Sequence, residues 1–83
     1  MKISYSKRSD VLYIVLATTA NPCTYVEIPG GIITRIDDVT ERVVGITIYS
    51  FMDKVESGER LSIPELGEDL SGISLLGLYS RAS

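Results

Sequence analysis

The sequence predicts a single α+β domain in which an antiparallel β-meander of four to five strands is followed by one or two short helices. Short runs of β-branched and aromatic residues, separated by turn formers, fill positions 1–50. The clearest run, residues 42–50, alternates apolar side chains around Gly45. After Ser50 the apolar spacing becomes helical, with Phe51 and Val55 four positions apart. One domain of 83 residues is therefore expected, with a meander over 1–50 and a helical or irregular cover over 51–83.

The five expected strands are residues 2–5, 11–16, 23–28, 31–37 and 42–50. The second is a continuous apolar run, which predicts a central strand covered on both faces. In the fifth, Val44, Ile46 and Ile48 are expected on one face, and the opposite face is expected to carry Val43, Gly45, Thr47 and Tyr49. Short connections predict antiparallel pairing of sequential strands. Gly45 within a strand predicts a bulge, a bend or close approach of another chain segment.

The residues after the sheet contain helix signals. Ser50 is the expected N-cap of a short helix whose inner face carries Phe51, Val55 and Met52, and Ser57-Gly58 is its expected end. Pro64 suits the first turn of a second helix over residues 65–70. Residues 72–79 fit either a strand or a helix.

Charge and composition exclude several classes of protein. The net charge of −3 argues against a nucleic-acid-binding surface, and no apolar run is long enough to cross a membrane. The start of the chain predicts no signal peptide, and a lone cysteine, Cys23, favours a cytoplasmic setting. Residues 1–8 carry three cations and no acid, whereas residues 53–69 carry six acids against two cations, 2 − 6 = −4. The acidic segment suits a basic partner or the basic end of a second copy.

Two groups of residues resemble a known family. The opening of the family resembles two segments of this chain, Ile3-Ser4-Tyr5 and residues 10–16. The later part of the family resembles Glu27, residues 31–33, Ile36-Asp37 and residues 42–48. The family is the prokaryotic domain of unknown function 2283, and the resemblance covers residues 1 to about 50. It implies a small sheet with helical decoration, no established activity and, in some members, a genomic setting beside small toxin-like nucleases.

The chain departs from this family at three places. Lys7-Arg8 stands where the family usually has acids in the first turn, and Thr47 stands where it usually has a glutamate. Residues 38–41 form a longer turn than the usual tight Asp-Gly-like one. Any family function that depends on those acids is therefore in doubt for this chain.

The sequence lacks the residues of the common catalytic and metal sites. Without histidine there is no His-based acid–base catalysis and no activated serine or cysteine, so Cys23 is expected to be structural and no cofactor or metal is expected. Pro29-Gly30-Gly31 precedes a strand, which indicates a plain turn rather than a phosphate loop. The acids at one hairpin tip, Asp37, Asp38 and Glu41, lack calcium-loop spacing and are expected in a solvated turn.

A carboxylate among tyrosines is the remaining ligand-site signal. The candidate residues for such a site are Asp10, Glu27, Tyr13 and Tyr25. The competing interpretation is structural: Asp10 caps a turn, and the tyrosines, including Tyr5, bury their rings and keep their hydroxyls in water. Tyr79 is expected to be a packing anchor.

Three functions remain open. The first is a non-enzymatic protein-interaction module. The more specific form of this hypothesis, an acidic partner of a basic, toxin-like protein, depends only on the genomic setting of the family. The second is a small-molecule-binding domain or an enzyme that uses Asp10 and Glu27 with tyrosines, and the third is a self-assembling structural unit. Because apolar residues lie on both faces of the expected sheet, a homodimer or larger assembly is predicted.

Overall fold

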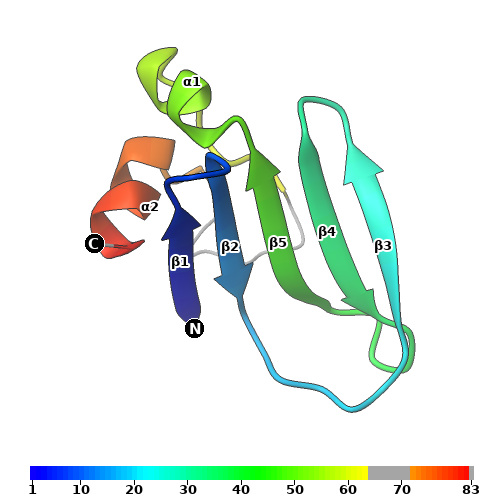
Figure 1. Ribbon diagram of the computed structural model, residues 1–83. Coiled ribbons are helices and arrows are strands. Elements are labelled where there is room, and N and C mark those ends of the chain that lie inside the picture. The colour runs from blue at the N-terminus through cyan, green and yellow to red at the C-terminus, as the bar shows by residue number, and fades with distance from the viewer. Residues whose placement is uncertain (64–71, 83) are drawn as a thin grey trace.

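The sheet joins an N-terminal hairpin to a three-stranded meander through its central strand (Figure 1). The computed structural model describes residues 1–63 and 72–82. The strands are β1 (Lys2–Ser6), β2 (Val11–Val15), β3 (Cys23–Ile28), β4 (Ile32–Asp37) and β5 (Val43–Tyr49). Their order is β1-β2-β5-β4-β3, and each pair of neighbours is antiparallel. The expected fold class is confirmed.

The predicted pairing of strands that follow one another in sequence is confirmed for β1 with β2, β3 with β4 and β4 with β5, and it is wrong for β2 with β3. β2 lies beside β5, and residues 16–22 run along the end of the sheet to carry the chain to the far edge strand, β3 (Figure 1). The register sets Leu12 opposite Ile48 and Ile14 opposite Ile46. This pairing joins two apolar stripes into one, which the pairing of β2 with its sequence neighbour β3 would not do.

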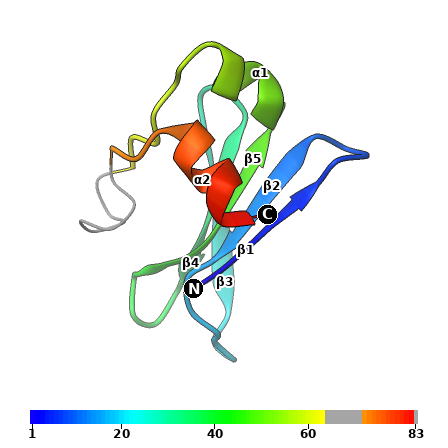
Figure 2. The same cartoon turned by 90° about the vertical axis from the view of Figure 1, so that its left-hand side faces the viewer.

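The described segments that follow β5 gather on one face of the sheet. The helices α1 (Phe51–Glu56) and α2 (Leu75–Ala82) lie on the same side, with residues 57–63 between α1 and the undescribed part of the chain (Figure 2). Together they close a core over the middle of the sheet. Its buried members are Leu12, Ile14, Ile46, Ile48, Phe51, Leu61, Ile63, Leu75 and Leu78.

The opposite face of the sheet is not covered by any of these segments. Tyr13 and Val15 of β2 are 43% and 44% exposed. The expectation that this strand is covered on both faces is therefore wrong, although the strand is internal to the sheet. Its continuous apolar run reflects one face in the core and one face on which Val11 is buried while Tyr13 and Val15 stay about half exposed.

A bulge near the start of β5 changes the face of one valine. The register shifts beside Arg35, so that Ile36 pairs with Val43 while Arg35 pairs with Gly45. The additional residue turns Val43 toward the core, where it packs as a partly buried side chain. Simple alternation placed Val43 on the other face, and that assignment is wrong. The bulge next to Gly45 is one of the features that this glycine predicted.

Helix α1 begins differently from the expectation and ends as expected. Ser50 precedes the helix in a left-handed conformation, and its side chain makes no capping hydrogen bond. The capping group is Asp10, whose Oδ1 accepts from the Met52 N–H at 3.0 Å and whose backbone oxygen accepts from the Phe51 N–H at 3.1 Å. The helix ends at Ser57-Gly58, with Gly58 at φ 73.

The structure settles one C-terminal ambiguity. Residues 72–79 contain a short bridge at Ser74, paired with Arg60, and then the first five residues of α2. The helix expected over residues 65–70 lies outside the described residues. Within residues 1–63 and 72–82, no helix is long and apolar enough to cross a membrane.

Gly45 is the position at which a substitution tests this packing. A Cβ there would lie 3.5 Å from the Ile14 carbonyl oxygen and 3.6 Å from the Arg35 Cβ, both ordinary contacts. We therefore expect Gly45→Ala to leave the free energy of unfolding unchanged or to raise it by up to about 1 kcal/mol. Gly45→Val adds methyl groups against the Arg35 stem and should lower it by about 1–3 kcal/mol. Urea titration measures both values, and equal stability of the two variants would contradict this account.

Candidate functional site

The uncovered side of the sheet, here called the open face, carries two complete rows of side chains. The register aligns one residue from each strand in each row. The first row is Ser4, Tyr13, Thr47, Ile33 and Glu27, and the second is Lys2, Val15, Gly45, Arg35 and Tyr25. Both rows run from edge to edge of the sheet, so residues far apart in the sequence form one continuous surface.

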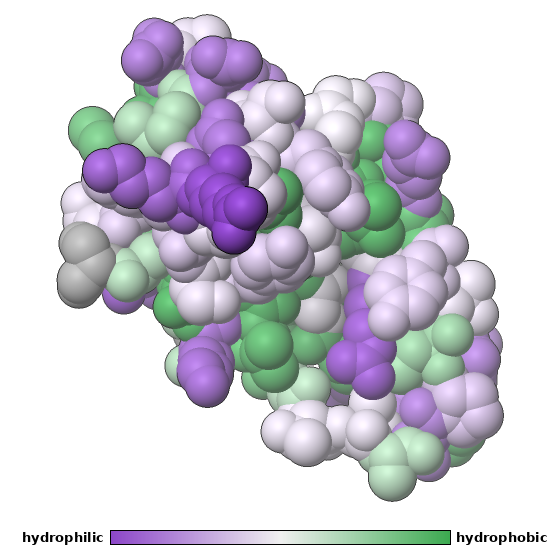
Figure 3. Space-filling view, in the orientation of Figure 1, coloured by the Kyte–Doolittle hydropathy of each residue, from purple (hydrophilic) through white to green (hydrophobic). Residues whose placement is uncertain are grey.

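Large side chains are exposed on this surface. Tyr25 is 69% exposed and Tyr49, beyond the first row, is 45% exposed. Figure 3 views the molecule from this side and shows apolar and polar groups interleaved over the strands. Along the two rows the central strand contributes the small residues Gly45 and Thr47. A shallow groove of 160 Å³ therefore follows it between the side chains of β2 and those of β3 and β4. The open face is thus an aromatic surface with a narrow central depression.

Arg35 is the cation at the centre of the open face. Gly45 gives its aliphatic stem space to lie across β5, because a Cβ at Gly45 would be 3.6 Å from the Arg35 Cβ and 3.9 Å from its Cδ. The Nε atom is shielded from solvent and has no hydrogen-bond partner among the described residues. The Arg35 side chain as a whole is only partly buried, and none of its donors is used in a hydrogen bond to the described residues, so an acceptor from outside the chain can approach it.

The four candidate ligand residues do not form one site, although Tyr13 and Tyr25 line the same groove. Glu27, Tyr13 and Tyr25 lie on the open face, with Glu27 and Tyr13 in one row but separated by two strands. Asp10 belongs to the turn between β1 and β2 and caps α1 on the covered side. A site that uses both carboxylates has no support in this geometry, since the strands that carry Glu27 and that flank Asp10 are at opposite edges of the sheet.

Asp10 holds a buried aromatic junction in place. Its Oδ1 accepts a hydrogen bond of 2.6 Å from the Tyr5 hydroxyl. The Tyr5 ring lies 5.5 Å from both the Phe51 ring and the Tyr79 ring, edge-on to the latter. Asp10 therefore serves the structure by linking β1, α1 and α2, and the expectation that Tyr79 is a packing anchor is confirmed.

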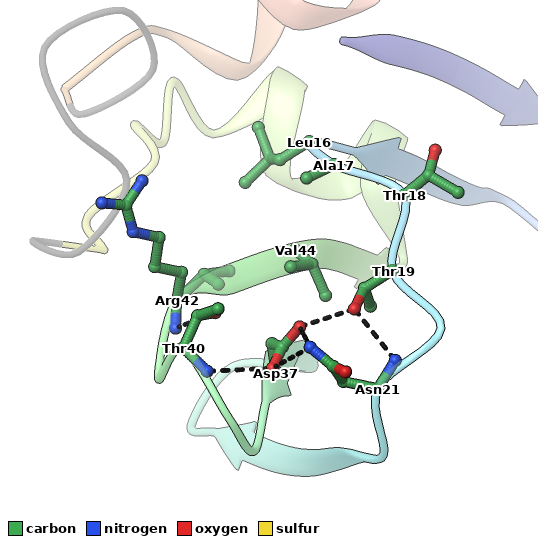
Figure 4. Close-up of a pocket in the computed structure, with 10 residues that line it drawn as sticks. Leu16, Ala17, Thr18, Thr19, Asn21, Asp37, Thr40, Arg42 and Val44 are labelled. Carbon is green, nitrogen blue, oxygen red and sulfur yellow. Dashed lines mark hydrogen bonds between the residues drawn. The ribbon is translucent and has the colours of Figure 1, made fainter.

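A second hollow lies at the end of the sheet, between the 16–22 crossover and the β4–β5 turn (Figure 4). Its volume is 420 Å³, and Asp37 lies at its base with Arg42 and Thr40 at one side. Four groups donate to the Asp37 carboxylate. They are the Thr19 hydroxyl at 2.6 Å, the Asn21 amide at 3.1 Å, and the backbone N–H groups of Val39 at 2.8 Å and Thr40 at 3.0 Å.

This carboxylate is a structural anchor. Asp37 is 2% exposed, and the donors hold its pKa well below the usual range, the Thr19 hydroxyl first and the Thr40 N–H next, although burial opposes them. It ties the crossover to the β4–β5 turn, and its oxygens are occupied by the chain itself. The expectation of a solvated acidic tip is wrong for Asp37, because the donors that bury it come partly from a loop 16–18 residues away.

The neighbouring Asp38 does not join this cluster. It accepts a hydrogen bond from the Thr24 hydroxyl at 2.6 Å, and over the described ranges no three His, Cys, Asp or Glu side chains gather as metal ligands. The Cys23 thiol is free and partly exposed, 3.5 Å from the Asn21 carbonyl oxygen. Sequence reasoning expected apolar residues on both faces of the sheet, but it did not identify this face as the one on which Tyr13 and Val15 stay exposed.

The Tyr5–Asp10 contact predicts a pH dependence at the alkaline end. The hydrogen bond to Asp10, with burial and the Asp10 charge, raises the pKa of Tyr5 from 10.0 to about 12. A raised folded-state pKa stabilises the fold fully below pH 10, and this contribution is lost as pH rises through 12. Absorbance titration should show one of the five tyrosines ionising near pH 12 and should lose that component in Tyr5→Phe. Tyr25→Phe is the control, and an unchanged late component in Tyr5→Phe would contradict the assignment.

The Asp37 anchor predicts a dependence at the acidic end. Because its folded-state pKa is lowered, Asp37 stabilises the fold above its unfolded pKa of about 4, and this stabilisation is lost as pH falls below that value. Asp37→Asn should lower Tm at pH 7 by about 5–10 °C and reduce the acid dependence of Tm. Asp38→Asn, one position along, should change Tm by less than half as much. Thermal scans between pH 2 and 7 measure both, and equal effects would argue against an anchor at Asp37.

The comparisons with known proteins agree with the resemblance in the sequence. No curated protein and no solved structure matches the chain. The model of the family described as Protein of unknown function (DUF2283) matches residues 2–51, which span all five strands and the start of α1. The resemblance drawn from the strand motifs is thereby confirmed over more than half of the chain. This protein belongs to the DUF2283 family of proteins of unknown function.

Proposed function

We propose that this protein is a non-enzymatic protein-interaction module that uses the open face as its contact surface. The observation that carries the proposal is the exposure of Tyr13, Val15, Tyr25 and Tyr49 on one uncovered side of the sheet. Tyrosine and arginine are enriched where proteins meet, and an extended apolar surface on a small domain usually has a partner. A second copy of the chain is the first occupant to test.

The chemistry of the acidic residues supports a non-enzymatic role. The chain has no histidine, and two of its carboxylates, Asp10 and Asp37, are already engaged by hydroxyl and amide donors of the fold. Glu27 is exposed on an edge strand without a neighbouring acid in its row. A general acid–base pair needs two groups directed at one point, and the described carboxylates do not supply one.

The other sequence-based hypotheses gain less support. The described acids of the acidic segment, Asp53, Glu56 and Glu59, belong to α1 and the residues after it, away from the open face. An acidic partner of a basic, toxin-like protein would therefore use a different surface and stays a prediction. A ligand site built on Asp10 with Glu27 lacks the required proximity.

Site-specific photocross-linking tests the proposal. A benzoylphenylalanine replaces Tyr25 on the open face or Leu76 on α2, which is 58% exposed on the helix side and serves as the matched control. We expect ultraviolet light to produce protein adducts from position 25 in the producing cells and few from position 76. Mass spectrometry of the adducts identifies the second chain. No adduct at 25, or equal adducts at both positions, would overturn the proposal.

A further inference from the structure

We propose that the open face pairs with the open face of a second copy in a twofold β-sandwich, with Arg35 of each chain bound to Glu27 of the other. This inference rests on the proposed function and names its partner and its contacts. Its starting observation is that both charged groups lie on the same exposed surface, yet neither has a hydrogen-bond or ionic partner among the residues that the structure describes.

The two rows of the open face are complementary to each other. A twofold axis that runs across the strands, midway between the rows, lays each strand over its own copy and exchanges the rows. Tyr13 then lies over Val15 of the second copy, and Thr47 lies over Gly45. Each contact sets a larger side chain against a smaller one, and all five strands overlap, as in aligned sheets packed about 10 Å apart.

The same exchange of rows accounts for the unpaired charges. Within one chain Glu27 pairs across with Ile33, and Arg35 pairs across with Tyr25. In the dimer, Glu27 of the first chain lies over Tyr25 of the second chain. Arg35 of the second chain is on the adjacent strand of its own sheet, next to that Tyr25. Two identical ion pairs result, one on each side of the axis, and each gives the guanidinium of Arg35 an acceptor that the described residues of its own chain do not provide.

The charge balance of the surface favours a second copy over a charged partner. The two rows contain Lys2, Arg35 and Glu27, a sum of +1. A strongly acidic partner would be repelled by Glu27, and a strongly basic partner would be repelled by Arg35. A second copy supplies both signs in the required positions, because twofold symmetry makes every contact reciprocal.

Charge reversal tests the pairing directly. Gel filtration with light scattering between about 1 and 100 μM should give twice the monomer mass of 9.1 kDa for the native chain. Arg35→Glu and Glu27→Arg should each weaken association by about tenfold or more, since like charges then face each other. An equimolar mixture of the two variants should regain the dimer, because each heterodimer contact then joins opposite charges. The double variant should also pair with itself.

Control reversals on the helix side are Arg81→Glu and Glu56→Arg, which should leave the dimer intact. Circular dichroism shows whether each variant is folded. If Arg35→Glu does not fold, Arg35→Gln replaces it in the mixture, where its Glu27 still meets Arg35 of the Glu27→Arg chain. A native chain that stays at 9.1 kDa, or single variants that do not recover on mixing, would overturn the pairing. If position 25 cross-links only a different protein, the interaction module stands and the homodimer fails.

Discussion

The pairing of β2 with β5 is the contact on which the rest of the structure depends. It joins a hairpin and a meander that are separated by the 16–22 crossover, and it brings Leu12 and Ile14 beside Ile48 and Ile46. Phe51, the first residue of α1, then closes over this stripe, and α2 follows on the same side. Because the paired residues are 30 to 38 positions apart in the sequence, from Val15–Gly45 to Val11–Tyr49, the core exists only once this long-range contact has formed.

Two buried or partly buried carboxylates hold the ends of this arrangement. At one end of the sheet, Asp10 accepts from the Tyr5 hydroxyl and from the first N–H groups of α1, so the helix begins where the hairpin turns. At the other end, Asp37 accepts from the crossover and from the β4–β5 turn. Each carboxylate is satisfied by donors from distant segments, which makes both residues anchors of topology.

The one-sided placement of the helices leaves the open face as the surface that distinguishes this domain. Gly45, the small residue that leaves space for the Arg35 side chain to lie across β5, also lines the groove along that strand. In the proposed dimer, the cation Arg35 and the acid Glu27 on this aromatic surface pair with their counterparts on a second copy, whereas a general ligand site would need converging polar groups. The physical properties of this face therefore suit a contact between protein chains.

The sequence by itself determined the local structure: the position of each strand, the glycine turn before β4, the helical spacing from Phe51 and the end of α1 at Ser57-Gly58 all follow from patterns spanning a few residues. The strand motifs also carried the family resemblance. Only the tertiary structure decided which strand lies beside β2, which face Val43 takes after the bulge, and which group caps α1. It alone showed that Asp37 is buried and that Tyr13 and Val15 remain exposed. The physical reason is that strand neighbours, capping groups and burial depend on segments distant in the chain. A local sequence pattern does not specify which distant segment packs against it.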